Sequence, residues 1–196
     1  MEEKVVLNEI ISNSFASNTY VVSNDKVAYI FDAGASLEKV IGVIKDKEVL
    51  GVFITHAHFD HILNVKKYVE HFKTKLYISS NGAEKLDDEN KNLGCMFNIK
   101  VDAKGIGNIE IVKDGQQFEA DDIVIKCCET PGHSNCSISY VVNNQYAIVG
   151  DVLFFNTVGR YDLYDSNYVK LVHSVKLLKS LDVVKYFPGH DMPFLK

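Results

Sequence analysis

The sequence predicts a single α+β domain in which helices cover sheet, and three observations carry this prediction. Short apolar runs rich in β-branched and aromatic residues recur along the chain. Stretches with helical spacing lie between these runs, and one pair of neighbouring runs is separated by only two residues. Because no internal repeat or change in composition marks a boundary, residues 1–196 are expected to form one domain.

The apolar runs have the length and composition of buried strands. Each of four such runs ends in a polar cluster, and this arrangement places polar side chains where strands stop. The pairs of run and cluster are 27–31 with Asp32-Ala33-Gly34, 52–54 with Thr55-His56, 147–149 with Gly150-Asp151, and 183–187 with Pro188-Gly189-His190.

Two stretches show apolar residues at spacings of three and four, which predicts amphipathic helices. Their apolar positions are Ile62, Val65, Val69 and Phe72 in the first, and Tyr168, Leu171, Val172, Val175 and Leu178 in the second. Segments 137–142 and 145–149 are joined by Asn143-Asn144, and a two-residue loop of this kind is typical of an antiparallel hairpin.

Composition and charge restrict the partners. The formal net charge is −5 and no basic stripe is present, which disfavours a nucleic-acid partner. No stretch approaches the roughly 18 apolar residues of a membrane span. No basic region followed by an apolar one precedes the first strand, so a secretory signal is not expected. We therefore expect a cytoplasmic protein with a small-molecule substrate; the oligomeric state is left open.

The four cysteines are Cys95, Cys127, Cys128 and Cys136, and none of them forms a CxxC pair. Adjacent Cys127 and Cys128 point to opposite faces if their segment is a strand, so they cannot both bind one zinc ion. All four are expected to be reduced thiols in or near the core.

Three histidines and one aspartate stand within six consecutive residues, at His56, His58, Asp60 and His61. Imidazole and carboxylate are ligands for zinc and similar divalent metals. The side chains of one short segment fan out, so they are more easily divided between two adjacent ions than wrapped around one. Such a density of ligands makes a purely structural role improbable.

Further ligands are expected from other strand ends, at His133, Asp151 and His190. Each of these is weak evidence alone, because a single histidine at a strand end is often only a packing residue. Together with the segment 56–61 they supply seven donors, which suits two ions with room for water. His71 and His173 lie off the apolar faces of their helices and are expected to be solvated.

The combined pattern resembles the metallo-β-lactamase superfamily, whose hallmark is H-x-H-x-D-H followed by a distal His, an Asp and a last His. The match runs from about Asn18 to His190, and Asp32-Ala33-Gly34 is similar to the Asp-x-Gly strand end of that family. The resemblance implies a four-layer αββα sandwich. It also implies that His56, His58 and His133 hold one metal, that Asp60, His61 and His190 hold a second, and that Asp151 bridges the two.

Features after Asp151 indicate a branch of the superfamily. Gly159-Arg160-Tyr161-Asp162 is similar to the Gly-Arg-x-Asp stretch of glyoxalase II-like enzymes, which hydrolyse hydroxyacyl thioesters. Two positions depart from the pattern of that branch. Leu63-Asn64 stands where Gly-Gly usually follows the D-H-x of the hallmark, and Cys136 stands where a Gly is common after the distal His. The chain ends at Lys196, before the helical domain that binds glutathione in that branch, which argues against glutathione specificity. The presence of Asp151 and the lack of an export signal disfavour antibiotic hydrolysis.

The expected reaction is hydrolysis of a small acyl thioester by a hydroxide shared between two divalent ions. Zinc is favoured, and iron and manganese are compatible with the same ligands. Asp60 is expected to orient the nucleophile as well as to bind metal. Arg160 has two open roles, docking an anionic substrate group or forming a structural ion pair.

Three alternatives stay open: a mononuclear iron persulfide dioxygenase, a lactone or phosphoester hydrolase on the same fold, and a non-catalytic metal-binding module.

Residues 83–108 are polar and irregular. They are expected to form a solvated loop; the second interpretation is a flap that brings Met96 and Phe97 to a pocket.

Overall fold

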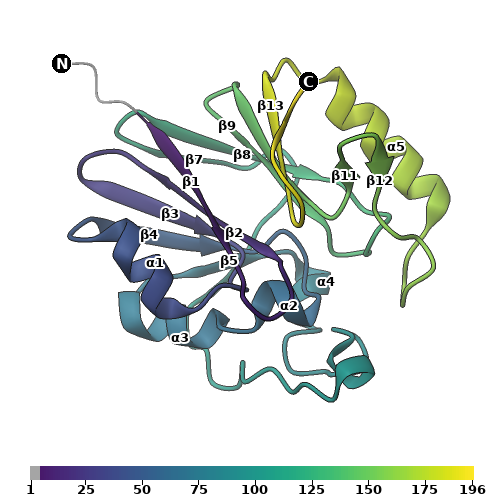
Figure 1. The fold of residues 1–196 in the computed structure, drawn as a ribbon, viewed down its shortest axis with the longest axis horizontal. Coiled ribbons are helices and arrows are strands. Elements are labelled where there is room, and N and C mark those ends of the chain that lie inside the picture. The colour runs from purple at the N-terminus through teal and green to yellow at the C-terminus, as the bar shows by residue number, and fades with distance from the viewer. Residues whose placement is uncertain (1–4) are drawn as a thin grey trace.

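The computed structural model describes residues 5–196, which form two mixed β-sheets with helices on the two outer sides (Figure 1). The strands are β1 (Val6–Ile11), β2 (Asn18–Ser23), β3 (Val27–Phe31), β4 (Glu48–Phe53), β5 (Leu76–Ile78), β6 (Ile109–Ile111), β7 (Gln117–Ala120), β8 (Ile123–Glu129), β9 (Ile138–Val142), β10 (Tyr146–Gly150), β11 (Leu153–Phe154), β12 (Thr157–Val158), β13 (Lys185–Pro188) and β14 (Phe194–Leu195). The helices are α1 (Leu37–Ile44), α2 (Phe59–Ile62), α3 (Val65–Phe72), α4 (Ser80–Ala83), α5 (Tyr168–Ser180) and the 3₁₀ helix η1 (Gly94–Phe97).

The first sheet has the strand order β1-β2-β3-β4-β5-β6, and the second has the order β14-β13-β10-β9-β8-β7. In the first sheet β3 to β6 run parallel, whereas the pairs β1–β2 and β2–β3 are antiparallel. The second sheet is antiparallel except for the parallel pair β10–β13. Strands β11 and β12 form a separate small hairpin.

Aromatic side chains fill the space between the two sheets. Phe53 lies 4.5 Å from Tyr77 and 5.3 Å from Phe31, measured between ring centroids, and Tyr140 from the second sheet also packs on Phe53. Phe31, Phe53 and Tyr140 are fully buried. Each such side chain contributes roughly 1.5–3 kcal/mol through burial, which makes this layer a main source of stability.

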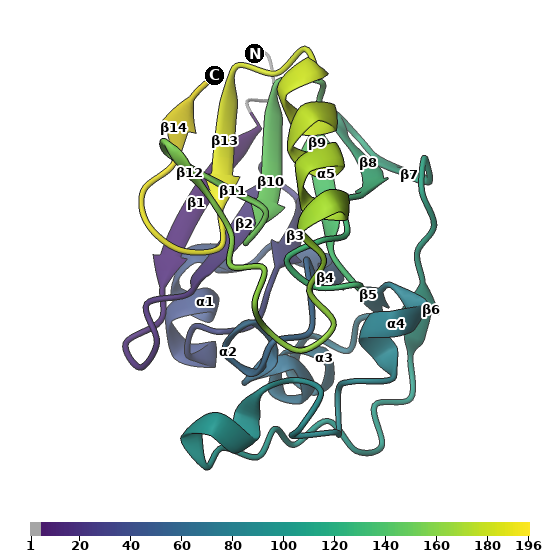
Figure 2. The same ribbon diagram turned by 90° about the vertical axis from the view of Figure 1, so that its right-hand side faces the viewer.

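Helices cover the outer face of each sheet. Val40 of α1 and Tyr68 of α3 are buried against Val52 and other residues of the first sheet. Leu171 and Leu178 of α5 are buried against the second sheet. Figure 2 shows α5 lying along the strands of the second sheet, while α1 and α3 lie beyond the first. The expected four-layer αββα sandwich is therefore confirmed.

Most of the expected local structure is present. The Asn143-Asn144 turn joins β9 to β10, and both residues have the positive φ, 50° and 51°, that a tight two-residue hairpin turn requires. Cys127 faces the space between the sheets and Cys128 faces α5, as strand alternation predicts. His71 and His173 are exposed on α3 and α5.

Other expectations need correction. The residues from Ile62 to Phe72 do not form one helix, because the helical conformation is interrupted between α2 and α3. At the break the amide N–H of Asn64 donates to Ala33 O over 2.9 Å, and its side chain Nδ2 donates to Ala35 O over 2.9 Å. The break thus anchors the ligand segment to the end of β3. Cys95 is exposed, unlike the three buried cysteines, and all four are free thiols.

Residues 83–108 are more than a solvated loop. Leu86, Leu93, Val101 and Ala103 are buried in the core between the first sheet and its helices. Lys85 is also buried, so this segment packs on the domain along much of its length.

No helix of residues 5–196 combines the length and the apolar character that crossing a membrane requires. The prediction about a secretory signal concerns the residues before the first strand. Of these, residues 1–4 lie outside the described part of the chain.

Candidate metal centre

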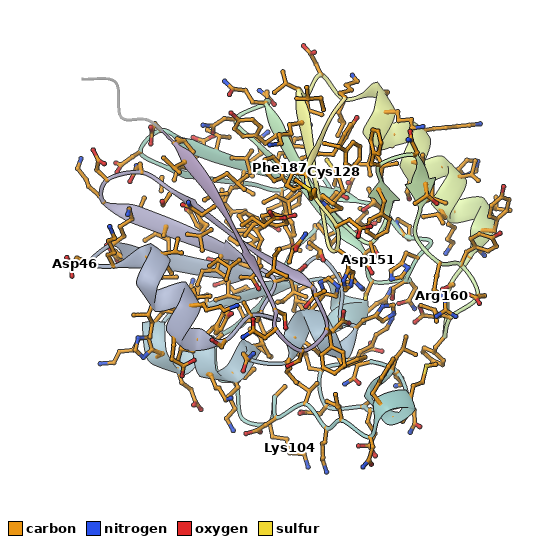
Figure 3. All side chains as sticks on the ribbon, in the orientation of Figure 1. Asp46, Lys104, Cys128, Asp151, Arg160 and Phe187 are labelled. Carbon is orange, nitrogen blue, oxygen red and sulfur yellow. The ribbon has the colours of Figure 1, made fainter. Side chains whose placement is uncertain are left out.

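The predicted ligands meet at one edge of the sandwich, where strands of both sheets end. His56 follows β4, Asp151 follows β10 and His190 follows β13. Because β10 and β13 are parallel, their carboxyl ends reach the same edge. Figure 3 shows Asp151 at this edge, with Arg160 further out toward the surface. The fold therefore brings together residues that are distant in the sequence.

A first group of ligand atoms belongs to His56, His58 and His133, all buried, whose candidate atoms lie within 4.8 Å of one another. His133 Nε2 is 3.0 Å from His58 Nδ1. His133 Nδ1 lies 2.9 Å from the Arg160 carbonyl oxygen, to which it can only donate. That bond selects the tautomer in which His133 Nε2 presents a free lone pair to the centre.

A second group belongs to Asp60, His61 and His190. Asp60 Oδ2 is 3.1 Å from His190 Nε2 and 3.5 Å from His61 Nε2. Asp60 and His61 are adjacent residues of the short helix α2, and the side chains of both contribute to this group.

Asp151 lies between these two groups. Its Oδ1 is 3.5 Å from His61 Nε2, and its Oδ2 is 3.6 Å from His133 Nε2 and 3.7 Å from His190 Nε2. A third group of candidate ligand atoms, which also lie within 4.8 Å of one another, belongs to His56, His61 and Asp151. A carboxylate in contact with members of both groups has the position that a bridging ligand needs.

Asp32 and Thr55 form a hydrogen-bond network with His56 and His61. Asp32 Oδ2 accepts a hydrogen bond of 2.9 Å from His61 Nδ1 and one of 2.7 Å from Thr55 Oγ1, and its Oδ1 accepts from the Thr55 amide over 2.7 Å. Thr55 Oγ1 is also 3.1 Å from His56 Nδ1. This network turns the Nε2 atoms of two histidines toward the centre.

Burial and neighbouring charges set the protonation states. Burial lowers the pKa of His56, His58 and His133, so their rings are neutral at physiological pH. Burial also acts to lower the pKa of His61, but the carboxylates of Asp60, Asp151 and Asp32 outweigh it and raise that pKa to about 10. A cluster so rich in carboxylates attracts positive charge.

The donor set fits divalent cations. Seven buried side-chain atoms of the described residues have no hydrogen-bond partner, and four of them belong to this centre: Nε2 of His56, His58 and His61, and Oδ1 of Asp151. Buried polar atoms are normally paired, and leaving one unpaired costs free energy. Bound cations would pair with the atoms of His56, His61 and Asp151 in this set, and nitrogen with carboxylate oxygen is the ligand mixture of zinc and related metals.

Gly189 permits the close approach of two candidate ligands. A Cβ atom at this position would lie 2.1 Å from Asp151 Oδ1 and 2.7 Å from His61 Cε1. The glycine before His190 is thus required by the space beside Asp151 and His61.

A cavity of about 470 Å³ opens over the two ligand groups. Its lining combines candidate ligands with apolar side chains, namely Phe15, His58, Phe59, Asp60, Leu93, Met96, Phe97, His133, Asp151, Phe154, Thr157, Val158, Gly159, Arg160, Leu163, His190 and Asp191. Met96 and Phe97 belong to the 83–108 segment, so the second interpretation of that segment, a flap beside a pocket, describes it better than a solvated loop.

Arg160 lines the same cavity, yet its guanidinium is engaged by Asp162. Arg160 Nε and Nη2 donate to the two carboxylate oxygens of Asp162 over 2.9 and 3.0 Å. Both side chains are about two-thirds exposed, at 64% and 65%. Of the two roles considered for Arg160, the structure contains the ion pair.

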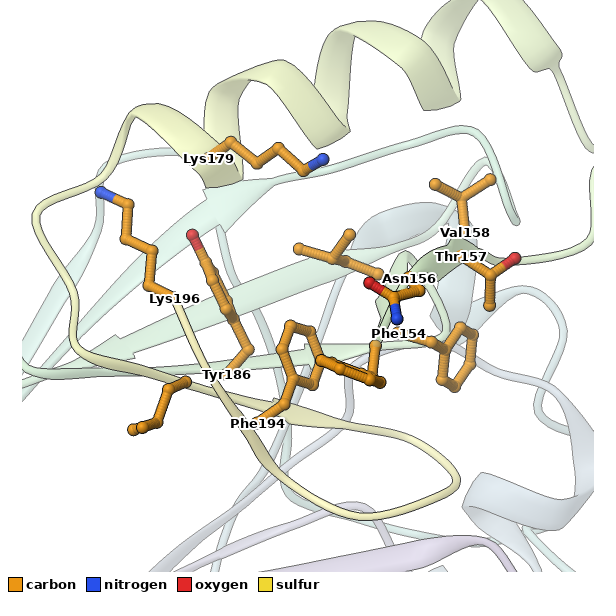
Figure 4. Close-up of a pocket in the computed structure, with 11 residues that line it drawn as sticks. Phe154, Asn156, Thr157, Val158, Lys179, Tyr186, Phe194 and Lys196 are labelled. Atoms are coloured by element: carbon orange, nitrogen blue, oxygen red, sulfur yellow. The ribbon is translucent and has the colours of Figure 1, made fainter.

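Another cavity, of about 620 Å³, lies between α5, the β11–β12 hairpin and β13–β14 (Figure 4). Phe154, Tyr186 and Phe194 form its apolar part, and Lys179 and Lys196 stand at its rim. None of the seven predicted ligands lines it. The predicted ligands therefore border only the cavity over the two ligand groups, of these two cavities.

The chain belongs to the metallo-β-lactamase superfamily. The family model described as "Metallo-beta-lactamase superfamily" matches residues 13–190, which include every predicted ligand. The histidine-rich centre and the αββα sandwich are thus those of a member of this superfamily.

Two relatives and one solved structure are similar to this chain over most of its length. "Probable metallo-hydrolase YqgX" of Bacillus subtilis is 33% identical over 180 residues, which are 89% of this chain and 84% of that protein. "Hydroxyacylglutathione hydrolase GloC" of Haemophilus influenzae is 26% identical over 190 residues, 90% of this chain and 86% of that one. The crystal structure of "BLEG-1 B3 metallo-beta-lactamase" has a TM-score of 0.88 and 28% identity, covering 97% of this chain and 94% of the other.

The roles of two residues around the centre, Asp32 and Phe15, are not evident from the sequence. The sequence places Asp32 at a strand end and in a motif similar to that of the family, but it does not indicate the hydrogen bonds of Asp32 with Thr55 and His61. Phe15, from the loop between β1 and β2, lines the cavity without any local signal. The placement of Asp32 directly after a buried apolar run was an available indication, because several of the predicted ligands occupy the same kind of position.

Proposed function

We propose that this protein is a binuclear metal-dependent hydrolase that acts on a small acyl thioester. In this proposal His56, His58 and His133 hold the first ion, Asp60, His61 and His190 hold the second, and Asp151 bridges them. The observation that carries it is Asp151, whose two oxygens reach histidines of both groups at 3.5–3.7 Å. A carboxylate so placed suits two ions better than one.

Zinc is the proposed metal, and iron or manganese would fit the same donors. When bound, the ions lower the pKa of water toward neutrality and polarise the substrate carbonyl. The chain supplies the rest of the machinery: the neutral imidazoles of His56, His58 and His133 as donors, Asp32 to orient His61, and a cavity over the two ligand groups.

Asp60 is proposed to have a second role in orienting the attacking water. Its Oδ2 already accepts a hydrogen bond of 3.1 Å from His190 Nε2, and the side chain lines the cavity. Charges on His61 and hydrogen bonding from His190 overcome the effect of burial and keep the pKa of Asp60 below its ordinary value. An ionised Asp60 can accept a proton or a hydrogen bond from water.

The reaction adds water across the C–S bond of the thioester and yields a carboxylic acid and a thiol. No oxidant is needed, and no Ser or Cys nucleophile is required. The relative named hydroxyacylglutathione hydrolase supports this substrate class, and the cavity lining makes glutathione itself a poor fit, because its carboxylates would find only Arg160 as a cationic side chain.

A β-lactam amide is the second candidate substrate. The sequence argued against it through Asp151, yet the solved structure named a B3 metallo-beta-lactamase superposes on this chain with a TM-score of 0.88. Both reactions are hydrolytic attacks on a carbonyl, so one centre could serve either.

The test combines metal analysis with a substrate panel. The natively expressed protein is analysed for zinc, iron and manganese. It is then assayed for thiol release from S-acetyl and S-lactoyl thioesters, and for hydrolysis of nitrocefin, a lactone and an aryl phosphodiester. Oxygen uptake is measured with glutathione persulfide.

Two metal equivalents with thiol release would support the proposal. One iron with oxygen uptake would replace it by a dioxygenase, and turnover confined to nitrocefin, the lactone or the phosphodiester would replace the substrate class. Metal binding with no turnover of any of these compounds would favour a non-catalytic module.

A further inference from the structure

Three phenylalanines from separate segments form one face of the cavity over the ligand groups. Phe15 comes from the loop between β1 and β2, Phe59 from α2 and Phe97 from η1. The ring centroids are 4.8 Å apart for Phe15 and Phe59, 5.0 Å for Phe59 and Phe97, and 5.9 Å for Phe15 and Phe97. These three residues are called the aromatic wall below.

The aromatic wall begins directly beside the candidate ligands. Phe59 stands between His58, a member of the first group, and Asp60, a member of the second. A substrate carbonyl placed over both groups would therefore have its substituents within reach of the wall. Leu93 and Met96 extend the same apolar surface, so the wall is continuous with the flap segment.

Part of this surface is exposed although it is apolar. Phe97 is 56% exposed and Met96 is 60% exposed, whereas Phe59 is buried. A ligand that covers exposed aromatic side chains removes their apolar surface from water, and this burial favours binding. Because both residues border the ligand groups, a bound substrate is the natural cover.

The charges around the cavity point to the same class of ligand. Among the described residues that line it, Arg160 is the only Lys or Arg, and its guanidinium is held by Asp162. Asp191 adds a carboxylate at the rim. A substrate group with its own carboxylates would thus meet little positive charge outside the metal centre, while an uncharged apolar group would meet the aromatic wall.

We infer that the aromatic wall binds the acyl part of the substrate, so that the preferred thioesters carry an aromatic acyl group rather than a small polar one. This inference rests on the proposed thioester hydrolysis. It names Phe15, Phe59 and Phe97 as the residues that determine specificity, with Phe97 as the most exposed of the three.

The experiment uses four thioesters of neutral thiols with the zinc-loaded protein. Three share N-acetylcysteamine and differ in the acyl group, which is phenylacetyl, acetyl or lactoyl. The fourth places the aromatic ring on the thiol, as S-benzyl thioacetate. We expect kcat/KM for the phenylacetyl compound to exceed that for each of the others by about tenfold, the equivalent of one well-packed aromatic contact.

Phe97→Ala tests the wall itself. It should lower kcat/KM for the phenylacetyl thioester by about tenfold, a larger loss than for the acetyl thioester. Phe97→Leu should retain part of the preference. The matched control is Phe155→Ala, which removes a ring that is 66% exposed and lies outside this cavity; it should change neither substrate.

A binding measurement separates this inference from the proposed function. Calorimetric titration of the zinc-loaded protein with phenylacetate and with acetate should show tighter binding of phenylacetate, and Phe97→Ala should remove the difference. If no thioester is hydrolysed, the proposed function fails, and the titration still decides on the wall. Equal binding of the two acids, equal kcat/KM for the phenylacetyl and acetyl thioesters, or a preference for the S-benzyl compound would overturn the inference.

Discussion

Asp32 Oδ2 and His61 Nδ1 are joined by a hydrogen bond of 2.9 Å beneath the ligand groups. Asp32 follows β3 and adopts a left-handed backbone conformation with φ of 60°. This conformation places the carboxylate where it accepts hydrogen bonds from both Thr55 and His61. The strand end thus determines the orientation of a ring that is 29 residues away in the sequence.

Asp32→Asn should weaken metal binding without unfolding the protein. Asparagine tolerates positive φ, so the backbone is preserved, but its amide cannot act as the charged acceptor for His61. We expect zinc affinity to fall by about 10- to 100-fold at the sites that include His61. Zinc titration against a fluorescent chelator measures the change. Asp102→Asn, which removes an exposed carboxylate paired with Lys66, is the control and should bind zinc as the wild type does.

His58→Ala should empty the first group of ligands and abolish turnover. The stoichiometry of bound zinc should fall from two to about one, because His56 and His133 alone hold an ion poorly. Elemental analysis and the thioester assay measure both effects. His71→Ala removes an exposed histidine of α3 and should leave metal content and activity unchanged. Full activity in metal-depleted His58→Ala protein would refute the metal-dependent mechanism.

Gly189→Ala should damage the centre although it adds a single carbon. The new Cβ would lie 2.1 Å from Asp151 Oδ1, so the carboxylate would have to move. The backbone cannot yield easily, because the Gly189 amide donates to Gly150 O over 2.8 Å and its carbonyl accepts from Asn18 N over 2.7 Å. We expect a loss of zinc affinity of about tenfold or more.

The control for that substitution is Gly107→Ala, because no atom lies within 4 Å of the corresponding Cβ. Circular dichroism verifies that both variants are folded. Wild-type zinc affinity in Gly189→Ala would show that Asp151 does not occupy the described position in solution.

The segment from His56 to His61 shows how much of the site could be predicted from the sequence. Ligand density over six residues and a preceding apolar run were enough to predict a metal centre at a strand end, and the fold does gather all seven predicted residues there. The same reasoning located Asp151 and His190, because each follows a strand. That they bind metal stays a prediction.

The surroundings of the site were less predictable. Met96 and Phe97 lie in a polar segment without regular apolar spacing, so the sequence favoured a solvated loop over the flap that brings these two residues to a pocket. The helical spacing that begins at Ile62 hid a break, because the hydrogen bonds of Asn64 to the end of β3 override the helical preference of the chain. Both features depend on tertiary contacts that the local pattern does not encode.

Lys85 is the buried residue whose role was least evident from the sequence, and it links the flap segment to the loop of His133. Its ammonium forms an ion pair with Asp165 and donates to Ser134 Oγ over 2.7 Å. Lys85→Met would leave the Asp165 carboxylate without its cation in a mostly buried position. We expect the free energy of unfolding to fall by about 3 kcal/mol, which urea denaturation measures.

Two further variants distinguish this effect from a general loss of charge. Lys75→Met breaks an exposed pair with Glu110 and should leave the urea midpoint unchanged. The double variant Lys85→Met with Asp165→Leu removes both charges of the buried pair and should recover part of the lost stability, because no unpaired buried charge is left. If Lys85→Met were as stable as the wild type, the ion pair between Lys85 and Asp165 would not contribute to the free energy of unfolding.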